Sequence, residues 1–175
     1  MTDIRVTARP GAHQGLLHIA GDVFPCALGR AGLVAKKREG DGGTPVGHFA
    51  LRELLYRPDR LEAPSTALPS RPIAPDDGWC DASGDPAYNR MVKLPYPASC
   101  ETLWRPDGLY DLVVPLGYND DPVVPGAGSA IFFHLAKEEG DGLGATEGCV
   151  ALRLADMHAV LARVTPQTRM TIGLA

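Results

Sequence analysis

Short apolar or alternating runs, separated by glycine and proline, recur along the chain from its first residues. Such runs are typical of β-strands when turn-forming residues bound them. They predict strands at residues 4–8, 16–20, 24–28, 91–94, 109–114, 130–135 and 170–174. The first two should form an opening hairpin, and the most apolar run, 130–135, should lie in the interior of a sheet.

One segment near the C-terminus has the periodicity of a helix instead. Its apolar residues fall on one face at helical spacing before Pro166, and they are Leu154, Met157, Val160, Leu161 and Val164. The segment 49–55 fits a short helix or a strand almost equally well, so its pattern leaves both open. The expected fold is therefore mainly β with one C-terminal helix.

Prolines concentrate in the middle of the chain. The 20 glycines and 16 prolines exceed average usage, which favours short strands joined by turns over a helical bundle. Twelve of the prolines lie between residues 57 and 125, where fixed φ and missing N–H groups exclude a central strand. Disordered segments are poor in aromatic residues, whereas this one contains or adjoins Trp79, Tyr88, Tyr96 and Trp104. We therefore expect an ordered cap packed over a cleft rather than a floppy linker.

The length of 175 residues fits a single domain, residues 1–175, with its own hydrophobic core. The 17 basic residues are outnumbered by 21 acidic ones and form no basic run, which argues against nucleic acid as a partner. The N-terminal residues lack the apolar stretch of a secretory signal, and no later run is long enough to predict membrane insertion. We expect a cytoplasmic protein or one exported by a leader outside this sequence. The oligomeric state stays open.

Four cysteines are present, and they are Cys26, Cys80, Cys100 and Cys149. They show neither a CxxC pair nor the ligand spacing of a closed zinc site, so we expect no metal and no cofactor. Buried free thiols are the preferred interpretation. A bridge between Cys80 and Cys100 stays open for an oxidising compartment.

The segment 131–152 carries the candidate chemistry. An apolar strand delivers His134, a glycine-rich loop follows, and Thr146-Glu-Gly-Cys149 leads into another apolar run. A thiol of ordinary pKa, about 8.5, is only slightly ionised at neutral pH, so a nucleophilic Cys149 needs a base such as His134. Gly148 would let a substrate carbonyl approach the backbone N–H groups of residues 147–149 as an oxyanion hole. On spacing alone, a buried cysteine and a loop histidine explain the pattern equally well.

The longer pattern resembles the L,D-transpeptidase catalytic domain, the YkuD-like family. His134 followed by Thr146-Glu-Gly-Cys149-Val is similar to that family's His…[Ser/Thr]-His-Gly-Cys signature. Upstream, Gly40 to Phe49 resembles the family's Gly-x-x-x-Thr-Pro-x-Gly-x-Phe turn, which we expect to be a scaffold at the edge of the site. The resemblance implies a β-sandwich with the Cys–His pair in a cleft beneath a variable cap.

Two positions depart from the family pattern. Glu147 stands where members usually have His, and Ala151 stands where Arg or Asn is frequent. The contact to a substrate carboxylate could then come from Arg153, if the chain bends suitably. Glu147 could orient a substrate ammonium or be a solvated loop carboxylate, and Tyr118 could line the cleft. Together with Thr146, these residues are the candidate substrate contacts.

The resemblance implies acyl transfer on peptidoglycan stem peptides or muropeptides through a cysteine thioester. An amine acceptor would give a cross-link, whereas water would give L,D-carboxypeptidase activity on tetrapeptide stems. The compact chain, the Thr-x-Gly-Cys variant and the proline-rich cap resemble an atypical proteobacterial branch that links L-alanine to diaminopimelate. A cross-linking enzyme is expected in the periplasm or cell envelope, and a carboxypeptidase in the cytoplasm. A non-catalytic peptidoglycan-binding module is the alternative from a different class.

Overall fold

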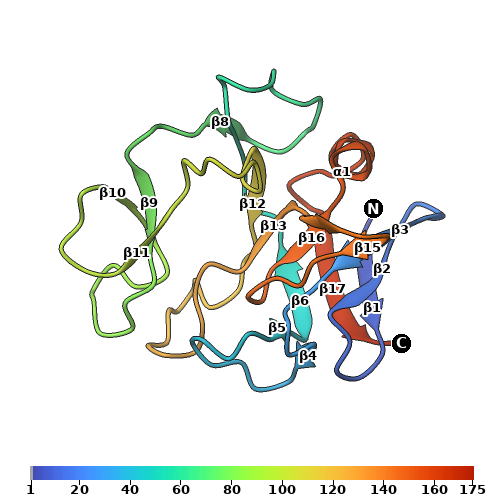
Figure 1. The fold of residues 1–175 in the computed structure, drawn as a ribbon, viewed down its shortest axis with the longest axis horizontal. Helices are drawn as coiled ribbons and strands as arrows, with labels where there is room; N and C mark the ends of the chain where they lie inside the picture. The colour runs from blue at the N-terminus through green and yellow to red at the C-terminus, as the bar shows by residue number, and fades with distance from the viewer. Residues whose placement is uncertain (1) are drawn as a thin grey trace.

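Residues 2–175 are described by a computed structural model, which consists mainly of short strands (Figure 1). In chain order the strands are β1 (Ile4–Ala8), β2 (Gln14–Ile19), β3 (Asp22–Ala27), β4 (Leu33–Val34), β5 (Thr44–Pro45), β6 (Gly47–Ala50), β7 (Leu54–Tyr56), β8 (Ser70–Pro72), β9 (Asp77–Cys80), β10 (Met91–Lys93), β11 (Cys100–Thr102), β12 (Leu112–Pro115), β13 (Phe132–Leu135), β14 (Glu138–Glu139), β15 (Gly142–Leu143), β16 (Val150–Leu152) and β17 (Arg169–Leu174). Helix α1 (Leu154–Leu161) precedes β17. The prediction of a mainly β fold with one C-terminal helix is confirmed within these residues.

Ten strands form one mixed sheet that curls around the main core. Their order is β6-β17-β1-β2-β3-β16-β13-β12-β7-β8. β1 and β2 form the predicted opening hairpin, and β17 returns parallel to β1. β13 lies between parallel β16 and antiparallel β12, so its predicted interior position is confirmed. A bridge between Leu51 and Leu116 joins the chain after β6 to the chain after β12, so the two halves of the sheet face each other across the core.

Alternation along β13 divides its side chains between two apolar clusters. Phe133 and Leu135 enter the main core, which they share with residues of β1, β2, β17 and α1. Phe132 belongs to a second cluster on the other face of the sheet. His134 points to that second face, because side chains two residues apart in a strand point the same way. His134 is therefore buried between the sheet and the segment that covers it.

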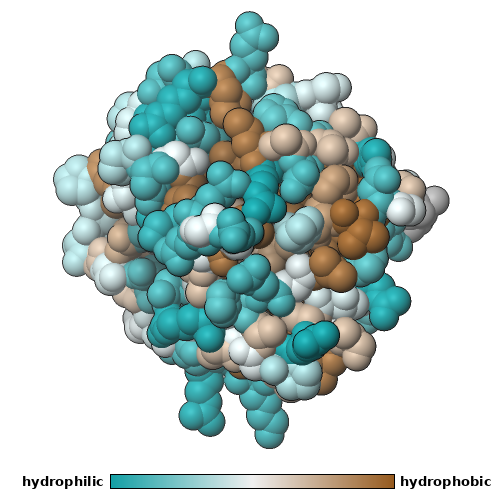
Figure 2. All heavy atoms as spheres, turned by 45° about the vertical axis from the view of Figure 1, so that its right-hand side comes forward, coloured by the Kyte–Doolittle hydropathy of each residue, from teal (hydrophilic) through white to brown (hydrophobic). Residues whose placement is uncertain are grey.

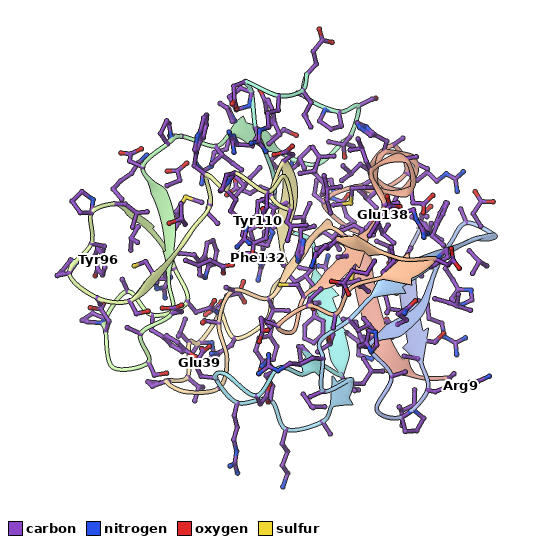
Figure 3. The ribbon with its side chains drawn as sticks, viewed as in Figure 1. Arg9, Glu39, Tyr96, Tyr110, Phe132 and Glu138 are labelled. Atoms are coloured by element: carbon purple, nitrogen blue, oxygen red, sulfur yellow. The ribbon has the colours of Figure 1, made fainter. Side chains whose placement is uncertain are left out.

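That covering segment is the cap, residues 73–111, which contains the three-stranded sheet β10-β9-β11. The aromatic rings of Trp79 and Tyr110 pack on Phe132 with centroids 5.1 and 5.6 Å away, and Figure 3 shows Tyr110 beside Phe132. The proline-rich segment is thus ordered and packed, as predicted. Its predicted range of 57–125 is too wide, because β8 and β12 belong to the main sheet.

Helix α1 covers one end of the main core. Leu154 was expected on its apolar face but is 49% exposed, and Val164 is buried beyond the helix end. The buried helical residues are Met157, Val160 and Leu161. The segment 49–55 is extended rather than helical, because it supplies the end of β6 and the start of β7 to the main sheet.

Most large apolar side chains are enclosed in the two clusters. The face shown in Figure 2 is mainly polar, with apolar side chains in small separate groups. Exposed large apolar residues among those described are Leu16, Val23, Val46, Val124, Leu154 and Leu174. No helix within residues 2–175 has the length and apolar character needed to cross a membrane.

Candidate active site

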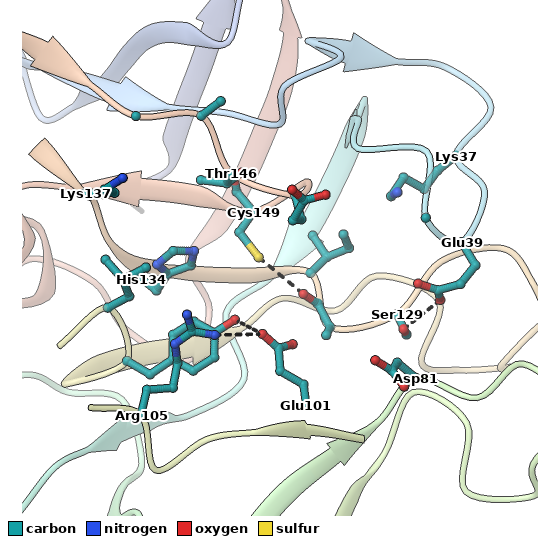
Figure 4. Close-up of a pocket in the computed structure, with 18 residues that line it drawn as sticks. Lys37, Glu39, Asp81, Glu101, Arg105, Ser129, His134, Lys137, Thr146 and Cys149 are labelled. Atoms are coloured by element: carbon teal, nitrogen blue, oxygen red, sulfur yellow. Dashed lines mark hydrogen bonds and ion pairs between the residues drawn. The ribbon is translucent and has the colours of Figure 1, made fainter. Parts of the chain in front are cut away.

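His134 lies on β13 and Cys149 lies directly before the neighbouring strand β16, with both side chains on the same side of the sheet (Figure 4). His134 on β13 is opposite Ala151 on β16, so Cys149, two residues before Ala151, lies beside Phe132. The N–H of Phe132 donates to Sγ of Cys149 at 3.3 Å, and the thiol donates to the carbonyl of Ala130 at 3.3 Å. Both side chains line one cavity of about 490 Å³. The structure thus brings together the residues that the sequence predicts as nucleophile and base.

Burial sets the protonation states of both groups. It raises the pKa of Cys149 to about 12, and the nearby carboxylate of Glu101 adds to this rise. Burial also lowers the pKa of His134 to about 4. At neutral pH the resting pair is therefore a thiol and a neutral imidazole. Because Nδ1 of His134 lies 2.8 Å from the carbonyl oxygen of Leu135, Nδ1 carries the proton and Nε2 keeps a free lone pair.

The hydroxyl of Thr146 organises the loop that carries Cys149. It donates to the carbonyl of Cys149 at 2.7 Å and accepts the N–H of Gly148 at 3.1 Å. Gly148 has a φ of +141°, and a Cβ at this position would lie 2.7 Å from the carbonyl oxygen of Gly43. Glycine is therefore required here by the close approach of two backbones. Thr146 also lines the cavity, so it occupies the place predicted for a substrate contact.

The turn at Thr44 supports this loop from the other side. Thr44 is fully buried, and its hydroxyl accepts the N–H of Gly29 at 2.8 Å. The carboxylate of Asp41 accepts the N–H of Gly43 at 2.9 Å, which holds in place the backbone that contacts Gly148. This placement fits the predicted scaffolding role at the edge of the site.

The cap supplies polar groups to the wall of the cavity opposite the sheet. Glu101 on β11 accepts a hydrogen bond from the hydroxyl of Tyr110 and lies 3.7 Å from the guanidinium of Arg105. Burial raises the pKa of Glu101, while Tyr110 and Arg105 oppose this rise. The ring of Tyr110 meets the ring of His134 edge to face, with centroids 5.1 Å apart. A chain of contacts therefore runs from Glu101 through Tyr110 to His134.

Charges of both signs line the cavity. In Figure 4, Arg105 and Lys137 lie on the side of His134, whereas Glu39 and Asp81 lie on the other side. Glu39 accepts a hydrogen bond from Ser129 at 2.7 Å, and one buried carboxylate oxygen of Asp81 has no partner among the described residues. The lining consists of Lys37, Glu39, Gly40, Asp81, Glu101, Arg105, Leu109, Tyr110, Ser129, Ala130, Ile131, His134, Lys137, Gly144, Ala145, Thr146, Glu147 and Cys149. Within residues 2–175, no group of His, Cys, Asp and Glu side chains is placed to hold a metal ion.

The remaining predicted substrate contacts have other partners. Glu147 lines the cavity, but its side chain is 82% exposed and pairs with Arg30. Tyr118 donates its hydroxyl to a backbone carbonyl, and Arg153 donates to Glu138 at 2.7 Å. Among the described residues, neither Tyr118 nor Arg153 belongs to the cavity lining. Their predicted role in this cavity is therefore not supported.

Sequence analysis did not identify Glu101, Arg105 and Tyr110 as site residues. Tyr110 lay inside a predicted strand, 109–114, whereas the strand in the structure begins at Leu112. The one signal that pointed toward this region was the concentration of aromatic residues in the proline-rich segment. That signal predicts packing over a cleft, but it does not single out the polar side chains that enter it.

Comparison with solved structures finds two L,D-transpeptidases, one from Mycobacterium smegmatis and L,D-transpeptidase 1 of Mycobacterium tuberculosis. Their identities are 14% and 12%, and their TM-scores are 0.44 and 0.43. The matches cover 98% and 99% of this chain, which spans only 59% and 63% of theirs. A comparison with curated proteins finds no match. The family model described as the L,D-transpeptidase catalytic domain, YkuD, matches residues 16–172, and the chain therefore belongs to this family.

Proposed function

We propose that this protein is a peptidoglycan L,D-transpeptidase that forms stem-peptide cross-links through a thioester on Cys149. The observation that carries the proposal is a thiol and a neutral imidazole, Cys149 and His134, on one sheet face at one cavity. Membership of the YkuD family supports the same type of chemistry. The proposed substrates are stem peptides or muropeptides.

In the first half-reaction, Sγ of Cys149 attacks the carbonyl of an L-centre in the donor stem while Nε2 of His134 accepts the thiol proton. Because burial disfavours the charged form of both groups, proton transfer accompanies the attack instead of preceding it. The tetrahedral intermediate then collapses to the thioester, and His134 returns the proton to the amine of the departing D-residue.

An oxyanion site needs free N–H groups beside the sulfur. The N–H of Gly148 is engaged by Thr146. The N–H groups of Glu147 and Cys149 have no acceptor among residues 2–175, so these two are the proposed donors to the developing oxyanion. This modifies the expectation that all of residues 147–149 contribute.

The second half-reaction decides between cross-linking and hydrolysis. An acceptor amine enters as an ammonium ion, which the carboxylates of Glu39, Asp81 and Glu101 attract to the cavity. It loses one proton to solvent, and the free amine attacks the thioester carbonyl. As the bond to Cys149 breaks, His134 passes a second proton from the nitrogen to the departing sulfur. Arg105 and Lys137 line the same cavity, and each must exchange its present ion-pair partner, Asp107 or Glu139, for the carboxylate that diaminopimelate also carries. These charges favour an amine over water as the acceptor. The proposal extends to a bond between L-alanine and diaminopimelate and to a site of action in the periplasm or cell envelope.

The test is mass spectrometry of muropeptides with tri-, tetra- and pentapeptide stems, incubated with wild type, Cys149→Ala and Cys26→Ala. Cys26 is a buried thiol on β3 and provides the matched control. Cross-linked dimers from wild type and Cys26→Ala, but not from Cys149→Ala, are expected, and fragmentation will locate the new bond. Tripeptide and free D-alanine alone would support the cytoplasmic L,D-carboxypeptidase instead. Unchanged stems would contradict both activities on these substrates.

A further inference from the structure

Two cysteines of the cap face each other across neighbouring strands. Cys100 on β11 is directly opposite Cys80 on β9. The N–H of Asp81 donates to the carbonyl of Ser99 at 3.1 Å, so the residues next to the cysteines form a hydrogen-bonded pair. Because such pairs alternate along an antiparallel ladder, Cys80 and Cys100 occupy a non-hydrogen-bonded pair, where side chains approach most closely.

This position has the spacing that a disulfide requires. Cα atoms of a non-hydrogen-bonded pair are about 4.5 Å apart, which lies inside the range of about 4.4–6.8 Å found for disulfides. Burial raises the pKa of Cys100, and the neighbouring Cys80 adds to this rise, in agreement with the close approach that the strand register requires. Both thiols are free in the structure. Closing the bond therefore needs no rearrangement of the strand pairing.

The residues beside the two cysteines belong to the active-site cavity. Asp81 follows Cys80 and Glu101 follows Cys100, and both carboxylates line the cavity that contains Cys149. A covalent bond between β9 and β11 would therefore hold these two residues at a fixed separation. Cys26 lies opposite Gly15 in the main sheet, and the sulfur of Cys149 contacts the N–H of Phe132, so neither of these cysteines faces another thiol there.

We propose that Cys80 and Cys100 form an intrachain disulfide by exchange with a low-molecular-weight disulfide, and that this bond staples β11, which carries Glu101, to the end of β9, directly before Asp81. Cys100 is partly exposed and attacks first, which joins one half of the reagent to Cys100 and releases the other half as a thiol. Buried Cys80 then attacks the sulfur of Cys100 and releases the second half. Two protein thiols are oxidised, one reagent disulfide is reduced to two thiols, and these thiols take up the two protons.

The staple is expected to form slowly and to be structural. Burial raises the pKa of Cys100, which lowers the fraction of reactive thiolate at neutral pH. A rapid redox sensor needs the opposite, a low-pKa and accessible thiol. In an oxidising compartment the disulfide is not reduced again, so even a slow reaction goes to completion there.

The first test treats folded protein with oxidised glutathione and then alkylates it in denaturant for intact-mass analysis and peptide mapping. Wild type and Cys26→Ser should each lose two alkylatable thiols and yield a linked peptide pair containing Cys80 and Cys100. Cys80→Ser should stop at a glutathione adduct on Cys100. A different linkage, or four alkylatable thiols in wild type after prolonged incubation, would overturn the proposal.

The second test measures the melting temperature of oxidised and reduced wild type. Closing a loop of this size should raise it on the order of 5–10 °C, and Cys80→Ser treated in the same way should show no rise. Equal melting of the two wild-type forms would refute the stapling role. Neither test requires turnover, so failure of the transpeptidase assay would leave this inference intact.

Discussion

Cys149 lies beside Phe132, whose N–H donates to its sulfur at 3.3 Å, and His134 follows Phe132 by two residues on the same strand face. The register of two parallel strands therefore positions both reacting groups. These strands lie inside a ten-stranded sheet and are buried on both faces. Core strands of this kind unfold locally only at a free-energy cost close to that of global unfolding. Cys149 and His134 should therefore keep their relative positions in the absence of substrate.

The protonation state of Cys149 can be tested through its reaction with iodoacetamide. Because burial raises its pKa to about 12, the alkylation rate should rise about tenfold per pH unit from pH 6 to 10, without a plateau. The measurement is mass spectrometry of the peptide containing Cys149, in a Cys80→Ser, Cys100→Ser background that removes the cap thiols. A plateau near neutral pH would show that a thiolate is already formed in the resting enzyme.

His134 should make the folded protein sensitive to mild acid. Its pKa is about 4 when folded and about 6.5 when unfolded, so between these values the unfolded chain binds the extra proton. The free energy of unfolding therefore falls as pH decreases from 6.5 to 4, by up to about 3 kcal/mol from this residue. His134→Gln should show a smaller fall in urea titrations across this range. His158→Gln, at an exposed position of α1, is the control and should follow wild type.

The strands and the reacting pair could be predicted because their signals are local. The run containing His134 is apolar and bounded by turn residues, and the glycine before Cys149 marks a close backbone approach. The register that brings Cys149 beside Phe132 could not be predicted. Strand pairing depends on contacts between segments distant in sequence, and a single sequence does not contain that information in its spacing.

The cap residues of the site illustrate the same limit. Glu101 reaches the cavity because residues 73–111 fold back across β13, whereas Glu62 in the same proline-rich segment is exposed. Nothing in their local sequence separates these two glutamates. Arg153 is much nearer to Cys149 in sequence than Arg105 is, yet Arg153 lies at the start of α1 and pairs with Glu138. Proximity along the chain therefore favoured an arginine that does not line the cavity.

Thr146 should matter through its two hydrogen bonds to the nucleophile loop. Thr146→Val keeps the shape of the side chain but removes the bonds to the Cys149 carbonyl and the Gly148 N–H. We expect a loss of about 1–3 kcal/mol in unfolding free energy and slower thioester formation. Thr146→Ser should restore both, since it retains the hydroxyl. Urea unfolding and single-turnover acylation would measure the two effects, and a valine variant equal to wild type would contradict this role.

Arg57 should anchor the cap to the main sheet. Its buried guanidinium binds Asp59 with two bonds of 2.9 Å, donates to the carbonyl of Arg105 at 2.5 Å and stacks on Trp104 at 3.8 Å. Lysine cannot reproduce this planar fork, so Arg57→Lys should destabilise the protein by about 1–3 kcal/mol and speed proteolysis within residues 73–111. Arg60→Lys, which alters a more exposed arginine of the same turn, should have a smaller effect in both assays.

Gly148 offers a test of whether backbone packing, and not only side-chain chemistry, positions the nucleophile. In Gly148→Ala the new Cβ would meet the Gly43 carbonyl at 2.7 Å, at a φ of +141° that residues with a side chain rarely adopt. The loop must shift, so we expect a loss of at least about 2 kcal/mol in unfolding free energy and displacement of Sγ from its bond with Phe132. Gly84→Ala is the matched control, because a Cβ there meets open space at an ordinary φ. It should change stability by less than about 0.5 kcal/mol. If Gly148→Ala matched this control in urea unfolding and in Cys149 alkylation, the contact with Gly43 would have no part in holding the nucleophile.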